Sequence, residues 1–207
     1  VENNTLTNFF ISGISYGEHS WYINCSDGLL SNVSEIRYFS IIDTIPPQIY
    51  YNPNTDASGI YNKNWIFINV TCSDVNGDSV ILNWDGTNES FDNQEENYYW
   101  ENKTGLDDGS YSFYAWCNDT YGNSNQTEIK NIVLDTISPT IIIISPENIT
   151  YNNATVLVNI SASDANLQSI WYNWNGTNVS YTEPHYVTFT EGTNTLHVWA
   201  NDSVGNM

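Results

Sequence analysis

Six aspartates at repeated positions are the residues whose type and spacing could bind a metal ion. They form two sets of three, Asp43, Asp74 and Asp119, and Asp135, Asp164 and Asp202. Three carboxylates with nearby carbonyl and Asn oxygens are the hard ligands that Ca²⁺ prefers. Asp and Asn also cap turns by bonding their own backbone, and that alternative needs no ion. The calcium hypothesis requires the three loops of each set to meet at one end of a domain, where an ion would stiffen the joint between domains.

The chain carries little that could perform catalysis. His19, His185 and His197 are the only histidines, and none has a counterpart in another repeat. No Gly-x-Ser-x-Gly, His-Glu-x-x-His or phosphate-binding loop occurs. The carboxylates that recur do so at matching positions, as structural residues would. We therefore expect no catalytic residues and a protein that is not an enzyme.

The net charge and the hydropathy pattern argue against nucleic acids and membranes as partners. The formal net charge is −20, with four Lys and Arg against 24 Asp and Glu. Phosphate binding needs basic residues, so nucleic acids and anionic membranes are poor partners. The longest notable apolar run, Ile141 to Ile144, has the length of a strand and not of a membrane span. We expect no membrane contact within these residues.

Asn-x-Ser/Thr sequons are more frequent than chance predicts. Fourteen occur, whereas the composition alone would produce about six. The alternative is that an Asn- and Thr-rich β protein collects such triplets by composition. The excess predicts a secreted chain with covalent N-glycans and an extracellular or cell-surface location. The acceptors are Asn3, Asn24, Asn32, Asn69, Asn88, Asn102, Asn118, Asn125, Asn148, Asn153, Asn159, Asn175, Asn178 and Asn201.

Internal repeats define the domains. The segment 117–123 returns at 200–206, with a looser copy at 25–28, and in each case a Gly lies eight residues upstream. Repeats of this kind set the architecture of the whole chain. We expect the C-terminal half of one domain at 1–42, a complete domain at 43–134, and a domain lacking its last strand at 135–207. This organisation predicts an excerpt of a longer repeat protein.

Alternating apolar residues between turn signals predict an all-β chain. Strands at spacings of 8 to 12 residues favour a sandwich or barrel. The stretch Asn93 to Asn102 has no clear register. The main expected strands are 6–11, 19–25, 35–42, 48–51, 65–72, 79–84, 110–117, 126–134 and 141–144.

Four segments carry a resemblance to a known class of protein. These are Asp-Thr-Ile-Pro-Pro at 43–47, Ser-Pro-Glu-Asn-Ile-Thr-Tyr-Asn at 145–152, Ala-Ser-Asp-Ala-Asn-Leu at 162–167 and Ala-Asn-Asp-Ser-Val-Gly-Asn at 200–206. The chain resembles the tandem immunoglobulin-like repeats of archaeal and other prokaryotic cell-surface proteins, of the S-layer or adhesin type. The resemblance implies immunoglobulin-like β-sandwiches but no particular activity. Antibody domains place Tyr two residues before the second Cys, whereas Ala115 stands there, so antibody-type domains are not expected.

The cysteines fit facing strands of such a sandwich. Cys72 and Cys117 fall on inward positions, and the third repeat has Ala162 and Ala200 at both places. This paired change predicts a Cys72–Cys117 disulfide, with Cys25 bonded to a partner before Val1. Three buried free thiols are the alternative. Trp84 and Trp174 are expected to pack over these paired positions, as the Trp of an immunoglobulin domain does.

Two outward aromatic residues could mark an interaction site. Trp116 and Trp199 precede inward residues and should point away from the core. They could contact a neighbouring subunit, stack on sugars, or lie under glycans and linkers. The composition and repeats predict a structural module of a filament, stalk or surface layer, with copies of itself or other surface proteins as partners. An adhesin stalk and spacer domains of a secreted hydrolase are the alternatives. Exchange of the last strand between subunits and simple truncation both remain open.

Overall fold

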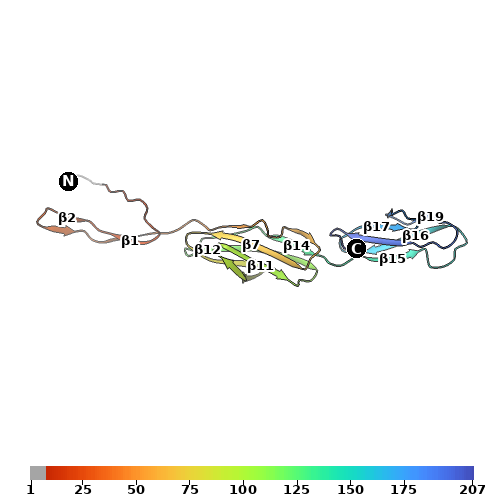
Figure 1. Ribbon diagram of the computed structural model, residues 1–207. Helices are drawn as coiled ribbons and strands as arrows, with labels where there is room; N and C mark the ends of the chain where they lie inside the picture. The colour runs from red at the N-terminus through yellow and green to blue at the C-terminus, as the bar shows by residue number, and fades with distance from the viewer. Residues whose placement is uncertain (1–7) are drawn as a thin grey trace.

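The computed structural model describes residues 8–207, and all of its regular secondary structure is β. Figure 1 shows three units in a row along an extended molecule, with the N-terminal unit at the left. The prediction of an all-β chain of immunoglobulin-like sandwiches is confirmed. Over the described range, the chain has no helix with the length and apolar character needed to cross a membrane.

The first unit is one long, interrupted hairpin without a core. β1 pairs with β4 and β2 pairs with β3, and no residue from 8 to 42 is buried. The prediction of a strand over 6–11 is wrong for residues 8–11, which have no regular secondary structure. Residues 6 and 7 lie outside the described residues. The four strands are β1 (Gly17–Trp21), β2 (Asn24–Ser26), β3 (Ser31–Val33) and β4 (Arg37–Ile41).

The second unit is a sandwich of two sheets. One sheet has the order β10-β11-β7-β5, and the other has the order β6-β14-β12-β8-β9, with β13 also pairing with β12. All pairs are antiparallel except β6 with β14. The first sheet is built from β5 (Gln48–Tyr51), β7 (Trp65–Ser73), β10 (Asn93–Glu95) and β11 (Tyr98–Thr104). The second is built from β6 (Gly59–Tyr61), β8 (Gly77–Trp84), β9 (Thr87–Ser90), β12 (Gly109–Asp119), β13 (Ser124–Gln126) and β14 (Lys130–Leu134).

The core of the second unit comes from the alternating residues of its long strands. On β7, Ile66 and Ile68 are fully buried, and on β12 Phe113 is 1% exposed. β14 adds Ile132 and Leu134, which lie in the same cluster. Burying each of these side chains stabilises the fold by about 1.5–3 kcal/mol, so the sandwich depends on β14 as much as on the longer strands.

The third unit repeats the plan with fewer strands. Its sheets have the orders β15-β16-β19 and β18-β17-β20, and its core centres on Val158, Ile160, Tyr172 and Tyr181. Within the described residues, β20 pairs only with β17, and no strand takes the place that β14 holds beside β12. The strands are β15 (Thr140–Ser145), β16 (Thr155–Ser163), β17 (Leu167–Asn173), β18 (Val179–Tyr181), β19 (His185–Thr188) and β20 (His197–Asp202).

The expected packing of Trp84 on the disulfide is wrong. Trp84 lies opposite Phe113 in the β8–β12 ladder, whereas Cys117 lies opposite Val80. Four residues of strand separate these positions by about 13 Å, beyond the reach of an indole ring. Trp84 instead stacks on Tyr111 and Phe113, with ring centroids 5.5 and 6.1 Å apart.

Trp174 shows the same departure in the third unit. Its ring lies 4.8 Å from that of Phe189 between the sheets. Ala200 lies opposite Ile170, which is four residues before Trp174 along the chain. The hydrophobic pattern predicted inward Trp residues, but their place along the strand depends on the register of the ladder.

Candidate site at the joints between units

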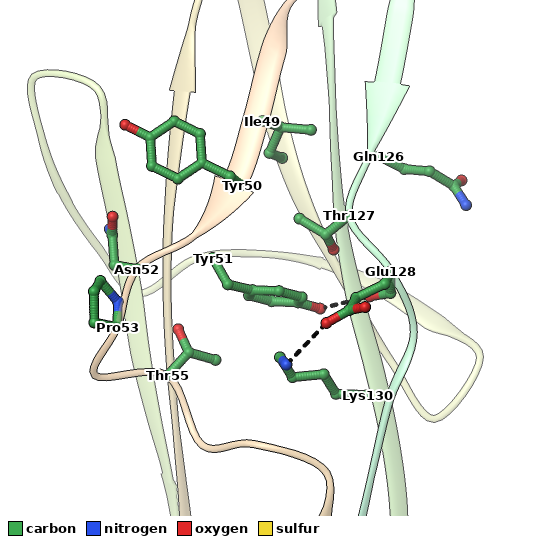
Figure 2. Close-up of a pocket in the computed structure, with 10 residues that line it drawn as sticks. All are labelled: Ile49, Tyr50, Tyr51, Asn52, Pro53, Thr55, Gln126, Thr127, Glu128 and Lys130. Atoms are coloured by element: carbon green, nitrogen blue, oxygen red, sulfur yellow. Dashed lines mark hydrogen bonds and ion pairs between the residues drawn. The ribbon is translucent and has the colours of Figure 1, made fainter.

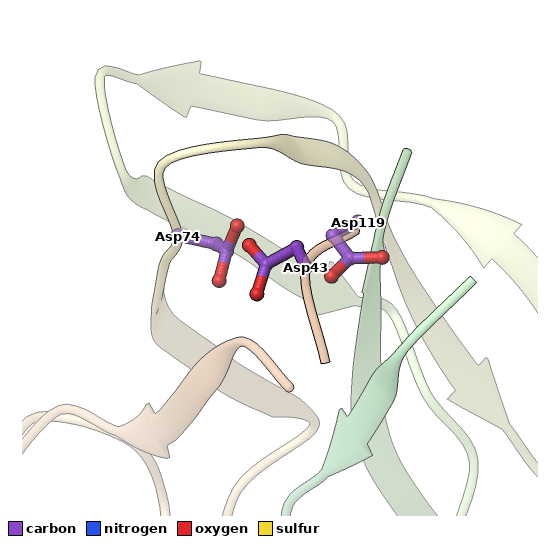
Figure 3. Close-up of side chains that lie close together, drawn as sticks. All are labelled: Asp43, Asp74 and Asp119. Carbon is purple, nitrogen blue, oxygen red and sulfur yellow. The ribbon is translucent and has the colours of Figure 1, made fainter. Parts of the chain in front are cut away.

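Three aspartates of the second unit meet where the chain enters it. Asp43 precedes β5, Asp74 follows β7, and Asp119 ends β12. β5 begins where β7 ends, since Gln48 pairs with Ser73. Ladder pairing sets Asp119 opposite Gly77, which is just beyond Asp74. One carboxylate oxygen from each aspartate lies within 4.8 Å of the others, as Figure 3 illustrates.

The third unit builds the same constellation from Asp135, Asp164 and Asp202. One carboxylate oxygen from each again lies within 4.8 Å of the others. The ladder positions correspond, because Thr140 pairs with Ser163 and Leu167 with Asp202. The structure thus brings together both sets of residues that the sequence singled out.

Asp119 is held by its own loop. Its Oδ1 accepts hydrogen bonds from the N–H groups of Tyr121, at 2.9 Å, and Asn123, at 2.8 Å, and its Oδ2 accepts one from Asn123 Nδ2 at 2.7 Å. Burial opposes ionisation, but the donors from Asn123, Tyr121 and Gly122 outweigh it and hold the pKa of Asp119 below its usual value. The repeated segment Asn-Asp-x-x-Gly-Asn is therefore a turn that closes on its aspartate.

Asp202 repeats this arrangement with Val204 and Asn206. Their N–H groups donate to Oδ1 at 2.9 Å each, and Asn206 Nδ2 donates to Oδ2 at 2.6 Å. Burial again opposes ionisation, and these donors again hold the pKa of Asp202 below its usual value.

The other aspartates tie the loops to the incoming chain. Asn76 N–H donates to Asp74 at 2.7 Å, and Asn76 Nδ2 donates to Asp43 at 2.9 Å. Asn123 Nδ2 also donates to the carbonyl of Asp43 at 3.0 Å. The turn-capping role that the sequence offered as an alternative is therefore present.

The third unit has the same ties. The Asn166 N–H donates to Asp164 at 2.7 Å, and Asn166 Nδ2 donates to Asp135 at 2.7 Å. Asn206 Nδ2 reaches the carbonyl of Asp135 at 3.0 Å. Both joints thus use one Asn in the loop after β7 or β16 and one Asn in the loop after β12 or β20.

The clustered carboxylates can also accommodate a divalent cation. Two charges within 4.8 Å of each other repel by about 3 kcal/mol or more at an effective dielectric constant near 20. Opposite ligands of a Ca²⁺ ion, each at about 2.4 Å, are separated by about the same distance. The oxygens of each set are therefore close enough to be ligands of one ion, and a bound cation would relieve their repulsion.

Residues of the preceding unit reach each cluster. At the second joint, the Asn62 side chain hydrogen-bonds with that of Asn206, and Asp108 accepts from the N–H of Thr136 at 2.9 Å. At the first joint, the Tyr16 ring lies 5.9 Å from that of Tyr121. The negative charge of Asp43 is the main cause that raises the pKa of Tyr16.

The cysteines form one bond between the two sheets. Cys72 and Cys117 are disulfide-bonded, as predicted, with Cα atoms 6.8 Å apart. Ala162 pairs with Ile141 just as Cys72 pairs with Ile49, so the alanines of the third unit stand at the corresponding positions. Cys25 is an exposed free thiol.

The outward tryptophans lie on the surface of the second sheet of each sandwich. Trp199 is half-buried and stacks on Trp171, with ring centroids 6.4 Å apart and planes at 14°. Trp116 is half-buried between Ile81 and Gln126 on the neighbouring strands. Neighbouring side chains therefore cover part of both rings.

The sequons are spread over the surface of all three units. Nine of the thirteen described acceptors are exposed, and four are half-buried; Asn3 lies outside the description. The half-buried acceptors are Asn69, Asn118, Asn159 and Asn201. The amide nitrogens of Asn118 and Asn201 already donate to neighbouring side chains, Asp78 at 3.0 Å and Gln168 at 2.9 Å.

A shallow hollow on the second unit lies where the chain enters β14. Figure 2 shows Tyr51 and Lys130 converging there on Glu128. The Tyr51 hydroxyl donates to the Glu128 carbonyl at 3.0 Å, and Lys130 Nζ lies 3.1 Å from the Glu128 carboxylate. Burial raises the pKa of Tyr51 to about 12. These contacts fix the chain at the start of β14.

Comparison with known proteins adds only a likeness of fold. No family model matches the chain. No curated protein matches it either. Among solved structures, titin domains A168–A170 align over 95% of this chain and 80% of that one, with 8% identity and a TM-score of 0.49. The fibronectin(III)-like modules of Clostridium thermocellum CbhA align over 77% and 88%, with 15% identity and a TM-score of 0.36. Tandem Ig repeats of Dlar align over 77% and 91%, with 12% identity and a TM-score of 0.32.

Proposed function

We propose that this chain is a non-catalytic structural module of an extracellular assembly, such as a filament, stalk or surface layer. The observation that carries the proposal is the repeated joint. The same Asp and Asn residues clasp the incoming chain at both ends of the second unit, through Asn123 to Asp43 and Asn206 to Asp135. Joints that recur in this form suit a rod that bears load or spans distance, because domains without such contacts move by default.

The surface fits an extracellular setting. The disulfide persists in oxidising compartments. The net charge of −20 keeps rods apart and hydrated, and N-glycans on exposed sequons would add to that effect. Partners would be copies of the chain or other surface proteins, with the half-buried Trp116 and Trp199 as lateral contacts or sugar platforms.

Calcium at the joints is part of this proposal. An ion held by Asp43, Asp74 and Asp119 would lock the incoming chain to two loops of the second unit. The corresponding ion in the third unit would lock its joint in the same way. A chelator should then lower the melting temperature and increase the hydrodynamic flexibility, and added calcium should restore both. The double variant Asp74→Asn/Asp164→Asn should abolish the response. Unchanged melting and hydrodynamics would exclude the ion and leave turn capping as the role of the clusters.

Electron microscopy of the protein purified from its source, with glycans retained, tests the assembly role. Ordered filaments or sheets with close subunit contacts would support it. Dispersed flexible rods that bind a target through a distal head would favour an adhesin stalk. Dispersed rods joined to a catalytic domain would favour spacer modules of a secreted hydrolase.

A further inference from the structure

A cluster of three charged side chains lies between the two sheets of the second unit. Glu101 and Lys103 come from β11 in the first sheet, and Glu89 comes from β9 at the edge of the second sheet. The Lys103 ammonium forms ion pairs with Glu101 and with Glu89, the latter at 2.7 Å. The side chains of Lys103 and Glu101 are only 18% and 5% exposed. The lysine therefore links the two sheets from the inside of the sandwich.

The surroundings of this cluster are apolar. Glu101 lies opposite Ile68 in the β11–β7 ladder and Lys103 lies opposite Ile66, and both isoleucines are fully buried. The Lys103 ammonium also lies 5.6 Å from the centre of the Trp84 ring. Charges in such a place have lost most of their hydration, so any charge without a partner is costly.

The charges of the cluster do not balance. Two carboxylates share one ammonium, which leaves one negative charge in excess when all three groups are ionised. Among the described residues, the buried Oε2 of Glu101 has no hydrogen-bond partner. A proton on Glu101 would remove the excess charge and leave Lys103 paired with Glu89 alone. Two carboxylates beside each other bind a proton more tightly than either does in water.

The charged groups that act on Glu101 come from β9, from β11 and from the link between β9 and β10. Burial is the main cause that raises the pKa of Glu101; the negative charges of Glu89 and Asp92 add to it, and Lys103 opposes it. Burial opposes the charge of Lys103, but Glu101 and Glu89 outweigh it and hold the pKa of Lys103 above its usual value. On acidification Glu101 therefore takes up the proton while Lys103 stays charged.

The third unit replaces all three charged residues together. In the matching ladders, the positions of Glu89, Lys103 and Glu101 are held by Val179, Val187 and His185. The His185 ring has a partner at each nitrogen: Nδ1 donates to the Glu183 carbonyl at 2.9 Å, and Nε2 lies 2.8 Å from the Tyr172 hydroxyl. Three positions that change as a set behave as members of one site, and the unbalanced cluster belongs to the second unit.

We propose that Glu101, Glu89 and Lys103 form a proton-binding site between the sheets, which makes the second unit more stable at mildly acidic pH than at neutral pH. The proton binds to Glu101, and Lys103 then forms a balanced ion pair with Glu89 across the sandwich. The site lies inside one unit, so the proposal does not depend on the proposed assembly role or on calcium at the joints.

The direction of the effect follows from proton linkage. A carboxyl group with a raised pKa in the folded chain takes up a proton on folding, so its contribution is largest below the unfolded value of about 4.3 and is lost as the pH rises through the folded value. Asp119 has the opposite sign, because its pKa is lowered and its contribution is lost on acidification. The second unit is therefore most stable where Glu101 is protonated and Asp119 is still ionised.

Calorimetry over a pH series tests the site on the whole chain, with the variant Glu101→Gln for comparison. Glutamine has the shape of the protonated carboxyl group, so the variant has balanced charges at every pH. The transition that moves when the Cys72–Cys117 bond is reduced belongs to the second unit. At about pH 8 this transition should be lower in the original protein than in the variant, and the difference should shrink by at least about 4 °C by about pH 4.5.

Glu128→Gln is the matched control. Glu128 forms an ion pair with Lys130 at 3.1 Å in the same unit, but its side chain is 74% exposed, so the difference between this variant and the original should change by less than about 1 °C over the same range. Carbon-13 NMR of the unaltered protein supplies a readout that needs no variant to fold: the Glu101 carboxyl should titrate at higher pH than that of Glu128. Glu101 titrating together with Glu128, or a melting difference for Glu101→Gln that does not change with pH, would overturn the proposal.

Discussion

Removing the Cys72–Cys117 disulfide should destabilise the second unit and leave the third unit unchanged. The bond closes a loop with a sequence separation of 45 residues. On the chain-entropy model, opening such a loop costs about 4 kcal/mol at 25 °C. For a domain of this size each kcal/mol shifts the melting temperature by roughly 4–8 °C, so the second unit should melt about 16–32 °C lower.

The third unit provides the internal control. It has Ala162 and Ala200 where the second unit has its cysteines, so reductant has nothing to break there. Differential scanning calorimetry with and without reductant should therefore show one transition that moves and one that does not. The double variant Cys72→Ala/Cys117→Ala copies the third unit and should melt like the reduced protein, which would assign the moving transition to the second unit.

Alkylation and intact mass should accompany this experiment. Cys25 is exposed and free, so one thiol should react before reduction and three after reduction in denaturant. If reduction lowers the melting temperature of the second unit by less than about 5 °C, the loop-entropy reasoning is refuted, because such a shift corresponds to only about 1 kcal/mol. Equal shifts of both transitions would show that reductant acts elsewhere.

Three further predictions concern single groups. The pKa values of Asp119 and Asp202 are lowered in the folded protein, so both carboxylates should stabilise the fold fully above the unfolded pKa near 3.9. This stabilisation should be lost as the pH falls through the folded pKa values. The variant Asp119→Asn should therefore lose less stability than the original protein on acidification, as measured by melting curves over a pH series. Absorbance titration should show Tyr51 ionising near pH 12. Because its pKa is raised in the folded protein, Tyr51 should contribute to stability fully below about pH 10 and less above it. A titration midpoint near pH 10 would contradict its burial. Asn206→Ala removes the donor to the Asp135 carbonyl and should destabilise the third unit by roughly 1–3 kcal/mol in urea unfolding, whereas Ala at the exposed Asn152 should have little effect.

Patterns that depend on local alternation were readable from the chain. Ile66 and Ile68 alternate with polar or outward residues, and every inward position predicted on β7 is buried, whereas the predicted inward positions of the third unit are partly half-buried. The paired change from Cys72 and Cys117 to alanines indicated two positions that face each other, and the bond is present. These features follow from the two-residue period of a strand, which does not depend on its partner.

The strands β10 and β11 were not predictable from the sequence. The stretch 93–102 forms β10 and the start of β11, which pairs with β7 along its length. Glu101 and Lys103 point inward there and form an ion pair, with Glu101 only 4% exposed. Burial raises the pKa of Glu101. A charged inward face breaks the apolar alternation, so the sequence offered no signal for this strand.

By itself, the sequence determined the β class, the repeat spacing, the inward faces of the long strands and the sets of Asp residues at matching loop positions. Those properties are written in residue types and short periods. The tertiary structure alone decided which strands pair and in what register, and therefore that Trp84 stacks on Phe113. It also decided that the Asp oxygens of each set lie within 4.8 Å of one another. Such features depend on contacts between residues far apart in the chain, and local alternation carries no information about which distant segment fills a given place.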